Sequence, residues 1–312
     1  MTTAASHPPT APLSSAWSAL PPEYAIPDQA PSEAEAREYC RRLARSHYEN
    51  FSVASWFLPA PLRQHFFNVY AYCRISDDLG DEVGDTAASL QLLDQWGREL
   101  DACYDGHPRH PVFVALAETV RKFEIPKHEF ADLLTAFRQD QTVARYETFN
   151  GLLGYCRYSA NPVGHLVLYL CGYHDTERQR LSDYTCTALQ LANFWQDVST
   201  DFAKGRIYLP LEDLRRFGVS EEVIRDGENT TEFREMLKFE IERAREWFAQ
   251  GLPLIAKVDR ALAIDIELFS RGGQEILNAI ERQRYAVLGR RPAISKTRKL
   301  ALVARAALGK LR

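Results

Sequence analysis

Apolar residues recur every three or four positions through most of the chain, which is the spacing of one face of an α-helix. Strict alternation of apolar and polar residues, which would indicate β-strands, is scarce. The pattern predicts helices over residues 32–45, 61–82, 87–104, 111–123, 127–143, 149–170, 176–202, 231–255, 259–287 and 295–311. Ser32 is the expected N-cap of the first helix, and loops with glycine or proline separate later ones at 106–108, 171–173 and 289–292. We therefore expect an all-α protein, a helical bundle large enough to enclose a ligand.

The chain of 312 residues is long enough for two domains, but no linker or change of composition divides its middle. We expect a single domain over residues 32–289, followed by a basic segment over 290–312. Residues 1–31 contain seven prolines and little periodic apolar content, so they are predicted to form a disordered tail. They lack the basic region and apolar stretch of a signal peptide. No apolar run approaches the roughly 20 residues that cross a bilayer.

Charge and cysteine content exclude some classes of protein. The formal net charge is −4, from 38 basic and 42 acidic residues, so no overall basic field favours nucleic acid as a partner. The six cysteines lie at least 15 residues apart, without a CxxC pair. We therefore expect neither a zinc site nor a redox motif, but reduced thiols in a cytoplasmic protein.

Two acidic clusters lie about 120 residues apart within apolar helical segments, at 77–82 and at 197–201. In each cluster the outer aspartates are four residues apart, Asp77 with Asp81 and Asp197 with Asp201, which puts both carboxylates on one helix face. Such hard oxygen ligands suit Mg²⁺, which usually also keeps waters and substrate phosphates. One cluster alone is most often a solvated helix face. Two clusters facing one cavity would clamp a diphosphate.

Neighbouring residues favour the metal site. Tyr70, Arg74, Asp77 or Asp78, and Asp81 share one stripe of an apolar helix. Gln190, Asn193, Asp197 and Asp201 share another. Carboxylates seldom lie on buried faces without a partner or a metal. The candidate ligands of Mg²⁺ are Asp77, Asp78, Asp81, Asn193, Asp197 and Asp201.

These segments, residues 70–82, 190–201 and 206–210, resemble the squalene and phytoene synthase family over about residues 47–299. The resemblance implies the all-α isoprenoid synthase fold with a central apolar cavity, and Mg²⁺-dependent joining of two allylic prenyl diphosphates head to head. Residues 47–56 and 159–164 are most similar to the bacterial hopanoid-pathway subgroup, which includes hydroxysqualene synthase.

The resemblance also implies roles for individual residues. Arg74, Arg206 and Tyr208 match the family's phosphate contacts, and we expect Arg284 and Tyr285 to close a lid. For Arg74 an intrahelical ion pair with Asp77 or Asp78 stays an alternative. For His47 a role in diphosphate binding and a structural role at a helix start are equally expected. The expected catalytic residues are Tyr70, Asp77, Asp81, Asp197 and Asp201. The expected cavity walls are Phe51, Trp56, Phe57, Phe66, Phe67, Tyr70, Tyr155, Leu166, Tyr169, Leu189 and Phe194, and Tyr70 and Phe51 are the first candidates for stabilising a carbocation.

The chain departs from the wider family at positions that bear on the product. Tyr48 and Asn50 replace small hydroxyl residues, and Ser159-Ala160-Asn161 with Pro162 replaces the usual Val-Ala-Gly, which adds polar groups and a proline kink. A polar group there could position a water that captures the cation, with Tyr48, Asn50 and Asn161 as candidates. We therefore expect ionisation of presqualene diphosphate and capture of the rearranged cation to give hydroxysqualene.

Other functions stay open from the sequence. The alternative within the family is condensation of two farnesyl diphosphates to presqualene diphosphate or squalene, so the substrate is a C30 or a C15 prenyl diphosphate. Alternatives from other classes are an all-α metal-dependent nucleotide pyrophosphohydrolase and a non-catalytic scaffold.

The C-terminal segment bears on where in the cell the protein acts. Residues 290–312 contain eight basic and no acidic residues, a pattern typical of a solvated face or of an interfacial helix on anionic lipid. We expect peripheral contact with the inner face of the membrane, where other pathway enzymes could be partners.

Overall fold

The computed structural model describes residues 17, 20–46, 59–295 and 297–298. Four predicted site residues, His47, Tyr48, Asn50 and Phe51, lie outside this part of the chain. So do the predicted wall residues Trp56 and Phe57 and most of the predicted last helix.

The described residues are helical, as the sequence predicts. Their elements are η1 (Pro22–Tyr24), α2 (Glu33–Ser46), α4 (Arg63–Asp81), α5 (Thr86–Asp105), α6 (Pro111–Lys122), α7 (Lys127–Gln139), α8 (Phe149–Ser159), α9 (Asn161–Leu170), α10 (Thr176–Ala203), α11 (Leu211–Phe217), α12 (Glu221–Arg225), α13 (Thr231–Gly251), η2 (Leu252–Lys257) and α14 (Arg260–Arg282). In this part of the chain extended pairing is limited to an isolated bridge between Arg145 and Ile207. The all-α prediction is confirmed, and the short helices α11 and α12 are additions to it.

Local sequence signals account for most helix starts. Ser32 caps α2 reciprocally with Glu35: the Ser32 backbone N–H donates to Oε2 of Glu35 at 2.9 Å, and the Glu35 N–H donates to Oγ of Ser32 at 3.3 Å. The side chains of Asp175, Thr230 and Asp259 cap α10, α13 and α14. These polar caps explain why the predicted starts of these helices agree with the structure.

The predicted helix over 149–170 is broken in two. α8 ends at Ser159 and α9 begins at Asn161, and Ala160 between them has φ −121° and ψ −46°. Pro162 explains the break, because its ring removes a backbone donor and clashes with the preceding turn. The kink predicted from Pro162 is therefore confirmed.

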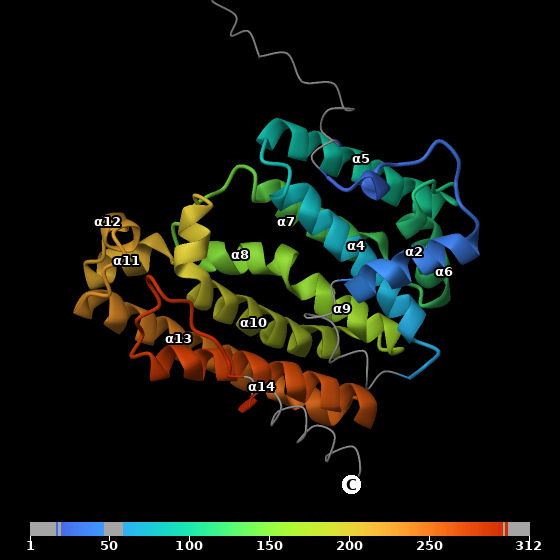
Figure 1. The fold of residues 1–312 in the computed structure, drawn as a ribbon. Coiled ribbons are helices and arrows are strands. Elements are labelled where there is room, and N and C mark those ends of the chain that lie inside the picture. Colours follow the sequence, from blue (N-terminus) through green and yellow to red (C-terminus); the bar gives the residue numbers. More distant parts are fainter. Residues whose placement is uncertain (1–16, 18–19, 47–58, 296, 299–312) are drawn as a thin grey trace, which may run out of the picture.

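The helices form two packed groups, and α8 and α9 pack against both of them (Figure 1). In the N-terminal group, α2 and α4–α7 surround a core that contains Tyr72 and Trp96, both fully buried. In the C-terminal group, α13 and α14 pack against α10. α8 and α9 lie between α4 and α10 in this view. This arrangement places the two acidic segments, at the C-terminal ends of α4 and α10, on opposite sides of α8.

Residues 20–31 differ from the predicted tail. Leu20 and Tyr24 are buried in the core, and the hydroxyl of Tyr39 on α2 donates to the backbone oxygen of Glu23 at 2.8 Å. The prediction of a disordered tail is wrong for these residues, because their few apolar side chains pack into the core of the N-terminal helices, a contact that the local sequence does not reveal.

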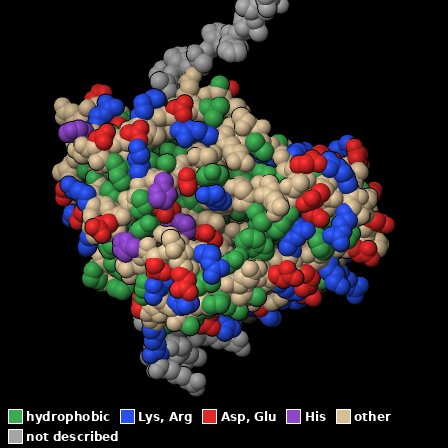
Figure 2. All heavy atoms as spheres, turned by 180° about the vertical axis from the view of Figure 1, so that it is seen from behind, with side chains coloured by type: hydrophobic (Ala, Val, Ile, Leu, Met, Phe, Trp, Pro, Cys, Tyr) green, Lys and Arg blue, Asp and Glu red, His purple; other side chains and the backbone are tan. Residues whose placement is uncertain are grey.

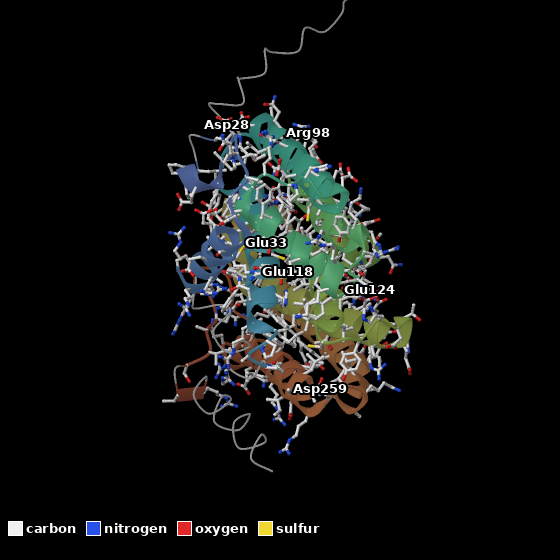
Figure 3. All side chains as sticks on the ribbon, turned by 90° about the vertical axis from the view of Figure 1, so that its right-hand side faces the viewer. Asp28, Glu33, Arg98, Glu118, Glu124 and Asp259 are labelled. Carbon is white, nitrogen blue, oxygen red and sulfur yellow. The ribbon has the colours of Figure 1, made fainter. Side chains whose placement is uncertain are left out.

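Charges of both signs are interspersed over the face shown in Figure 2. Some of them join helices. Arg37 on α2 bonds Glu33 on its own helix at 3.3 Å and Glu118 on α6 at 2.9 Å, and the two glutamates lie close together in Figure 3. Among the described residues we find no helix with the length and apolar character to span a bilayer.

Candidate active site

A cavity of about 420 Å³ opens between α4, α7, α8, α9, α10 and the segment that follows α10. Both acidic clusters reach it. Its lining residues are Tyr70, Cys73, Arg74, Asp77, Asp81, Leu133, Phe137, Asp140, Tyr155, Ser159, Val163, Gln190, Asn193, Phe194, Asp197, Asp201, Arg206 and Tyr208. The structure thus brings together twelve of the residues proposed from the sequence, including the expected wall residue Phe194, and it adds others that the sequence did not single out.

Helical spacing explains why both aspartate clusters face the cavity. Asp77 and Asp81 lie on the face of α4 that also carries Tyr70 and Arg74, and Asp197 and Asp201 lie on the face of α10 with Gln190 and Asn193. The two stripes predicted from the sequence therefore line one cavity from two sides.

Asp78 does not line this cavity. It is buried on another face of α4, where its carboxylate accepts hydrogen bonds from the Tyr24 hydroxyl at 2.8 Å and from Nε of Arg74 at 3.0 Å. The structure gives Asp78 a structural position rather than that of a metal ligand, because a step of one residue along a helix turns a side chain by about 100°. The intrahelical ion pair considered for Arg74 is present, although Arg74 also lines the cavity.

Two cations hold Asp81. Both Nη1 and Nη2 of Arg206 lie 3.0 Å from Oδ1 of Asp81, and Nζ of Lys204 lies 2.9 Å from Oδ2. Lys204 and Arg206 follow the end of α10, so these ion pairs join the segment after the second cluster to the first cluster. Arg206 was predicted from the resemblance; Lys204 was not.

Arg291 holds the second cluster. Its Nη2 donates to Oδ2 of Asp197 at 2.9 Å and to Oε1 of Gln196 at 3.1 Å, and Nε2 of Gln196 donates to the backbone oxygen of Pro292 at 2.6 Å. The sequence placed Arg291 in the basic C-terminal segment, and nothing in its neighbourhood indicated a contact with Asp197.

Arg284 and Tyr285 do not line the cavity. α14 ends at Arg282, and both residues have positive φ, 54° and 60°, which turns the chain away from the helix axis. The backbone oxygen of Arg284 accepts from Nη1 of Arg234 at 2.7 Å. The expectation that these two residues close a lid over the site does not agree with this position; Arg291 further along is the residue that reaches the acidic cluster.

Asn161 also lies elsewhere. Its Oδ1 accepts from the Thr187 hydroxyl at 3.0 Å, and it faces a separate pocket on the other side of α9, together with His165 and Asp183. The spacing of two residues from Ser159 accounts for this, because each residue along a helix turns the side chain by about 100°.

Asp140, just after α7, is a site residue that the sequence did not reveal. Its carboxylate accepts from the hydroxyls of Tyr155 at 2.8 Å and Tyr208 at 3.4 Å. Burial raises the pKa of Asp140 to about 6, even though Arg206 and Tyr155 favour its charged form. Asp140 was missed because it belongs to no acidic cluster in the sequence.

Aromatic rings form the adjoining wall. Phe194 and Tyr208 stack with ring centres 3.9 Å apart, and Tyr155 lies 5.7 Å from Tyr208. Leu133, Phe137 and Val163 continue the apolar surface. Of the other predicted walls within the described residues, Phe66, Leu166 and Tyr169 are core residues, and Phe67 and Leu189 pack beside the core. The cavity is thus charged at one end and apolar at the other, rather than apolar throughout.

The acidic end fits a divalent cation. Loss of contact with water and the neighbouring Asp81 carboxylate raise the pKa of Asp77 to about 6, and in the same way burial and Asp197 raise the pKa of Asp201 to about 7. A bound cation would relieve this repulsion. In the part of the chain that the structure describes, no three His, Cys, Asp or Glu side chains form a metal cluster. Mg²⁺ needs only one or two protein carboxylates, since phosphate oxygens and water complete its shell, so an aspartate pair suits it.

Helices around a cavity with two opposed aspartate pairs define the all-α isoprenoid synthase fold. A model of the squalene/phytoene synthase family matches residues 44–298, and the chain belongs to this family. Its fold is similar to that of squalene synthase HpnC from Alicyclobacillus acidocaldarius, at 45% identity and a TM-score of 0.77, over 86% of this chain and 98% of that one. It is also similar to a dehydrosqualene synthase, at 27% identity and a TM-score of 0.78, over 88% of this chain and 96% of that one. The 15-cis-phytoene synthase of Synechocystis sp. is 31% identical over 278 residues, 85% of this chain and 82% of the relative.

Proposed function

We propose that the protein is a Mg²⁺-dependent hydroxysqualene synthase, which converts presqualene diphosphate and water to hydroxysqualene and diphosphate. The observation that carries this proposal is one cavity whose charged end holds both aspartate pairs with Arg206, and whose other end is apolar. The charged end is suited to a diphosphate, and the apolar end to its prenyl chains.

We assign separate roles in this reaction to the residues that line the cavity. Asp77, Asp81, Asp197 and Asp201 would hold Mg²⁺, which supplies Lewis acid chemistry by neutralising the leaving diphosphate. Arg206 and Arg74 would bind diphosphate oxygens through the paired N–H groups of their guanidinium. The rings of Tyr70, Tyr155, Phe194 and Tyr208 would stabilise a carbocation and exclude water from most of its surface.

Two features favour capture by water over condensation of two farnesyl diphosphates. The first is the similarity of residues 47–56 and 159–164 to the bacterial hopanoid-pathway subgroup, which includes hydroxysqualene synthase. The identity of 45% to a structure named squalene synthase HpnC supports the condensation equally, because squalene is a product of that reaction. The second is Ser159, a hydroxyl in the wall of the cavity at the place where the chain departs from Val-Ala-Gly. The condensation is the second candidate function, because it requires the same acidic end.

Product analysis separates these functions. The protein is incubated with Mg²⁺ and either presqualene diphosphate or farnesyl diphosphate, without a reductant, and the products are identified by mass spectrometry. We expect hydroxysqualene from presqualene diphosphate and no C30 product from farnesyl diphosphate. Presqualene diphosphate formed from farnesyl diphosphate would contradict the proposal. Nucleoside triphosphates test the pyrophosphohydrolase alternative, and turnover of none of these substrates would favour a scaffold.

We also propose that the basic C-terminal segment docks on anionic membrane, where a water-insoluble product can leave. The full chain and a chain that ends at Arg298 are compared in flotation with vesicles of neutral and anionic phospholipid. The shorter chain keeps Arg291 and its contacts with Asp197. We expect it to float less with anionic vesicles; equal flotation would contradict docking.

A further inference from the structure

Ser159 is the last residue of α8, and its side chain lines the cavity. Its Oγ is buried, and it makes no hydrogen bond within the described part of the chain. A buried hydroxyl without a partner costs about 1–3 kcal/mol. Such an atom in a cavity wall therefore indicates a ligand that completes its hydrogen bonding.

Another serine in the same protein shows the usual arrangement. Oγ of Ser76 on α4 donates to the backbone oxygen of Tyr72 at 2.7 Å and accepts from Nε1 of Trp96 at 2.9 Å. A serine inside a helix commonly bonds back to its own helix in this way. Oγ of Ser159 makes no such bond among the described residues, although Ser159 lines the cavity.

The surroundings of Ser159 restrict what it can bind. Leu133, Phe137, Val163 and Phe194 line the same cavity and offer no side-chain hydrogen bond. Gln190 on α10 also lines it and supplies an amide as a further hydrogen-bonding group. A water fits these groups, because an ordered water needs two to four polar partners.

We propose that Ser159 binds the water that attacks the carbocation, and that it thereby determines that the product is an alcohol. This inference rests on the proposed function. The water oxygen forms a bond to the cationic carbon, and one O–H bond of that water breaks. The diphosphate released in the preceding step accepts the proton. No oxidant or reductant takes part, and the hydroxyl of Ser159 only orients the water.

The position of Asn161 supports this assignment. Asn161 is the other polar side chain that the departure from Val-Ala-Gly adds, but it bonds Thr187 and faces the pocket behind α9. Ser159 is therefore the member of this segment that is both polar and part of the cavity wall.

Two variants of nearly equal shape test the role of the hydroxyl. Ser159→Val removes it, and Ser159→Thr keeps it on a side chain of the same branching. A matched control is Thr135→Val, which makes the same exchange at an exposed hydroxyl on α7 that bonds the backbone oxygen of Ala131 at 3.1 Å. The measured quantity is the ratio of C30 alcohol to C30 hydrocarbon formed from presqualene diphosphate.

We expect Ser159→Val to lower this ratio at least about tenfold, because loss of one oriented hydrogen bond of about 1.4 kcal/mol changes a partition tenfold. The cation would instead lose a proton to the diphosphate and give a hydrocarbon. Ser159→Thr and Thr135→Val should keep the ratio of the unmodified chain. Circular dichroism and binding of Mg²⁺ with inorganic pyrophosphate show whether each variant is folded.

The outcomes separate the inference from the proposed function. If the unmodified chain gives no alcohol from presqualene diphosphate, the proposed function fails and the role of Ser159 fails with it. If the unmodified chain and Ser159→Val give alcohol in the same proportion, only the role of Ser159 is overturned. A folded Ser159→Val variant that consumes no presqualene diphosphate also overturns it, since capture by water follows ionisation.

Discussion

The guanidinium of Arg206 donates from Nη1 and Nη2 to the same oxygen of Asp81, at 3.0 Å each. Asp81 ends α4 and Arg206 follows α10, so this ion pair joins the two halves of the acidic site, 125 residues apart in the chain. It holds the carboxylate of the first cluster and the cation that we propose binds diphosphate at the same end of the cavity.

Arg206→Lys tests this relationship. Lysine keeps the charge but lacks the planar pair of donors, so we expect kcat/KM to fall by about 100-fold. Steady-state kinetics with the prenyl diphosphate measure it. Arg215→Lys, which alters an exposed ion pair with Glu147 away from the cavity, is the control and should stay within about twofold. Equal kinetics for both variants would contradict a binding role for Arg206.

Removal of the divalent cation should abolish turnover. With a chelator, we expect activity to fall below about one thousandth, and added Mg²⁺ to restore it. Asp77→Ala and Asp197→Ala should each lose activity to a similar degree, with a weaker response to Mg²⁺. The control is Asp94→Ala, which removes an exposed carboxylate on α5 that pairs with Arg138 on α7. Mg²⁺-dependent turnover at the normal rate in both Asp77→Ala and Asp197→Ala would rule out these carboxylates as ligands.

His165 should make stability depend on pH. It lies on α9 between Glu129 on α7, at 3.0 Å, and Asp183 on α10, at 2.7 Å, with His128 and Asp132 nearby. Burial alone would lower its pKa, but the hydrogen bonds to Asp183 and Glu129 outweigh burial and raise the pKa to about 9. The charged form is therefore favoured in the folded protein.

The direction in which stability changes with pH follows from the raised pKa of His165. The contribution of His165 to stability is fully present below about pH 6.5 and is lost as pH rises through about 9, with a size of up to about 3 kcal/mol. Urea unfolding of the unmodified chain and of His165→Gln at pH 6.5 and 9.5 measures it. We expect the two proteins to differ more at the lower pH. A difference that is the same at both values would show that His165 does not titrate in this interval.

Gly164 allows α9 to approach α10. A Cβ at this position would lie 2.2 Å from Oγ of Ser182 and 2.6 Å from Sγ of Cys186. Gly164→Ala should lower the free energy of unfolding by about 1–3 kcal/mol, because the two helices must move apart. Gly154→Ala on α8 is the matched control, since a Cβ there meets nothing within 4 Å. It should raise the free energy of unfolding by about 0.5–1 kcal/mol. A loss of stability at both positions would indicate that helix packing at Gly164 is not the cause.

The stripes on α4 and α10 were predictable because helical periodicity fixes which residues share a face. Asp77 with Asp81, and Asp197 with Asp201, needed only the spacing of four residues. Asp78 shows the limit of the same reasoning. Its neighbours in sequence are site residues, but its direction on the helix places it against Tyr24, and that contact depends on how residues 20–31 fold back.

Residues outside the clusters were not predictable in this way. Asp140 is a single carboxylate at the end of α7, and Arg291 lies in a basic segment whose composition is typical of solvent exposure. Each joins the site only because segments distant in the chain pack together. Asn161 and Ser159 are equally polar and only two residues apart, yet they line different cavities.

The sequence by itself determined most of the described helices, the two acidic faces and the family, because these depend on local periodicity and on motifs of short range. The tertiary structure alone decided which oxygen atoms and cations meet, since that depends on contacts between distant helices and on the rotation of each side chain about its helix axis. Most residues of the charged end of the cavity can therefore be predicted from the sequence. That the buried hydroxyl of Ser159 has no hydrogen-bond partner depends on how the helices pack, so the sequence alone could not show it.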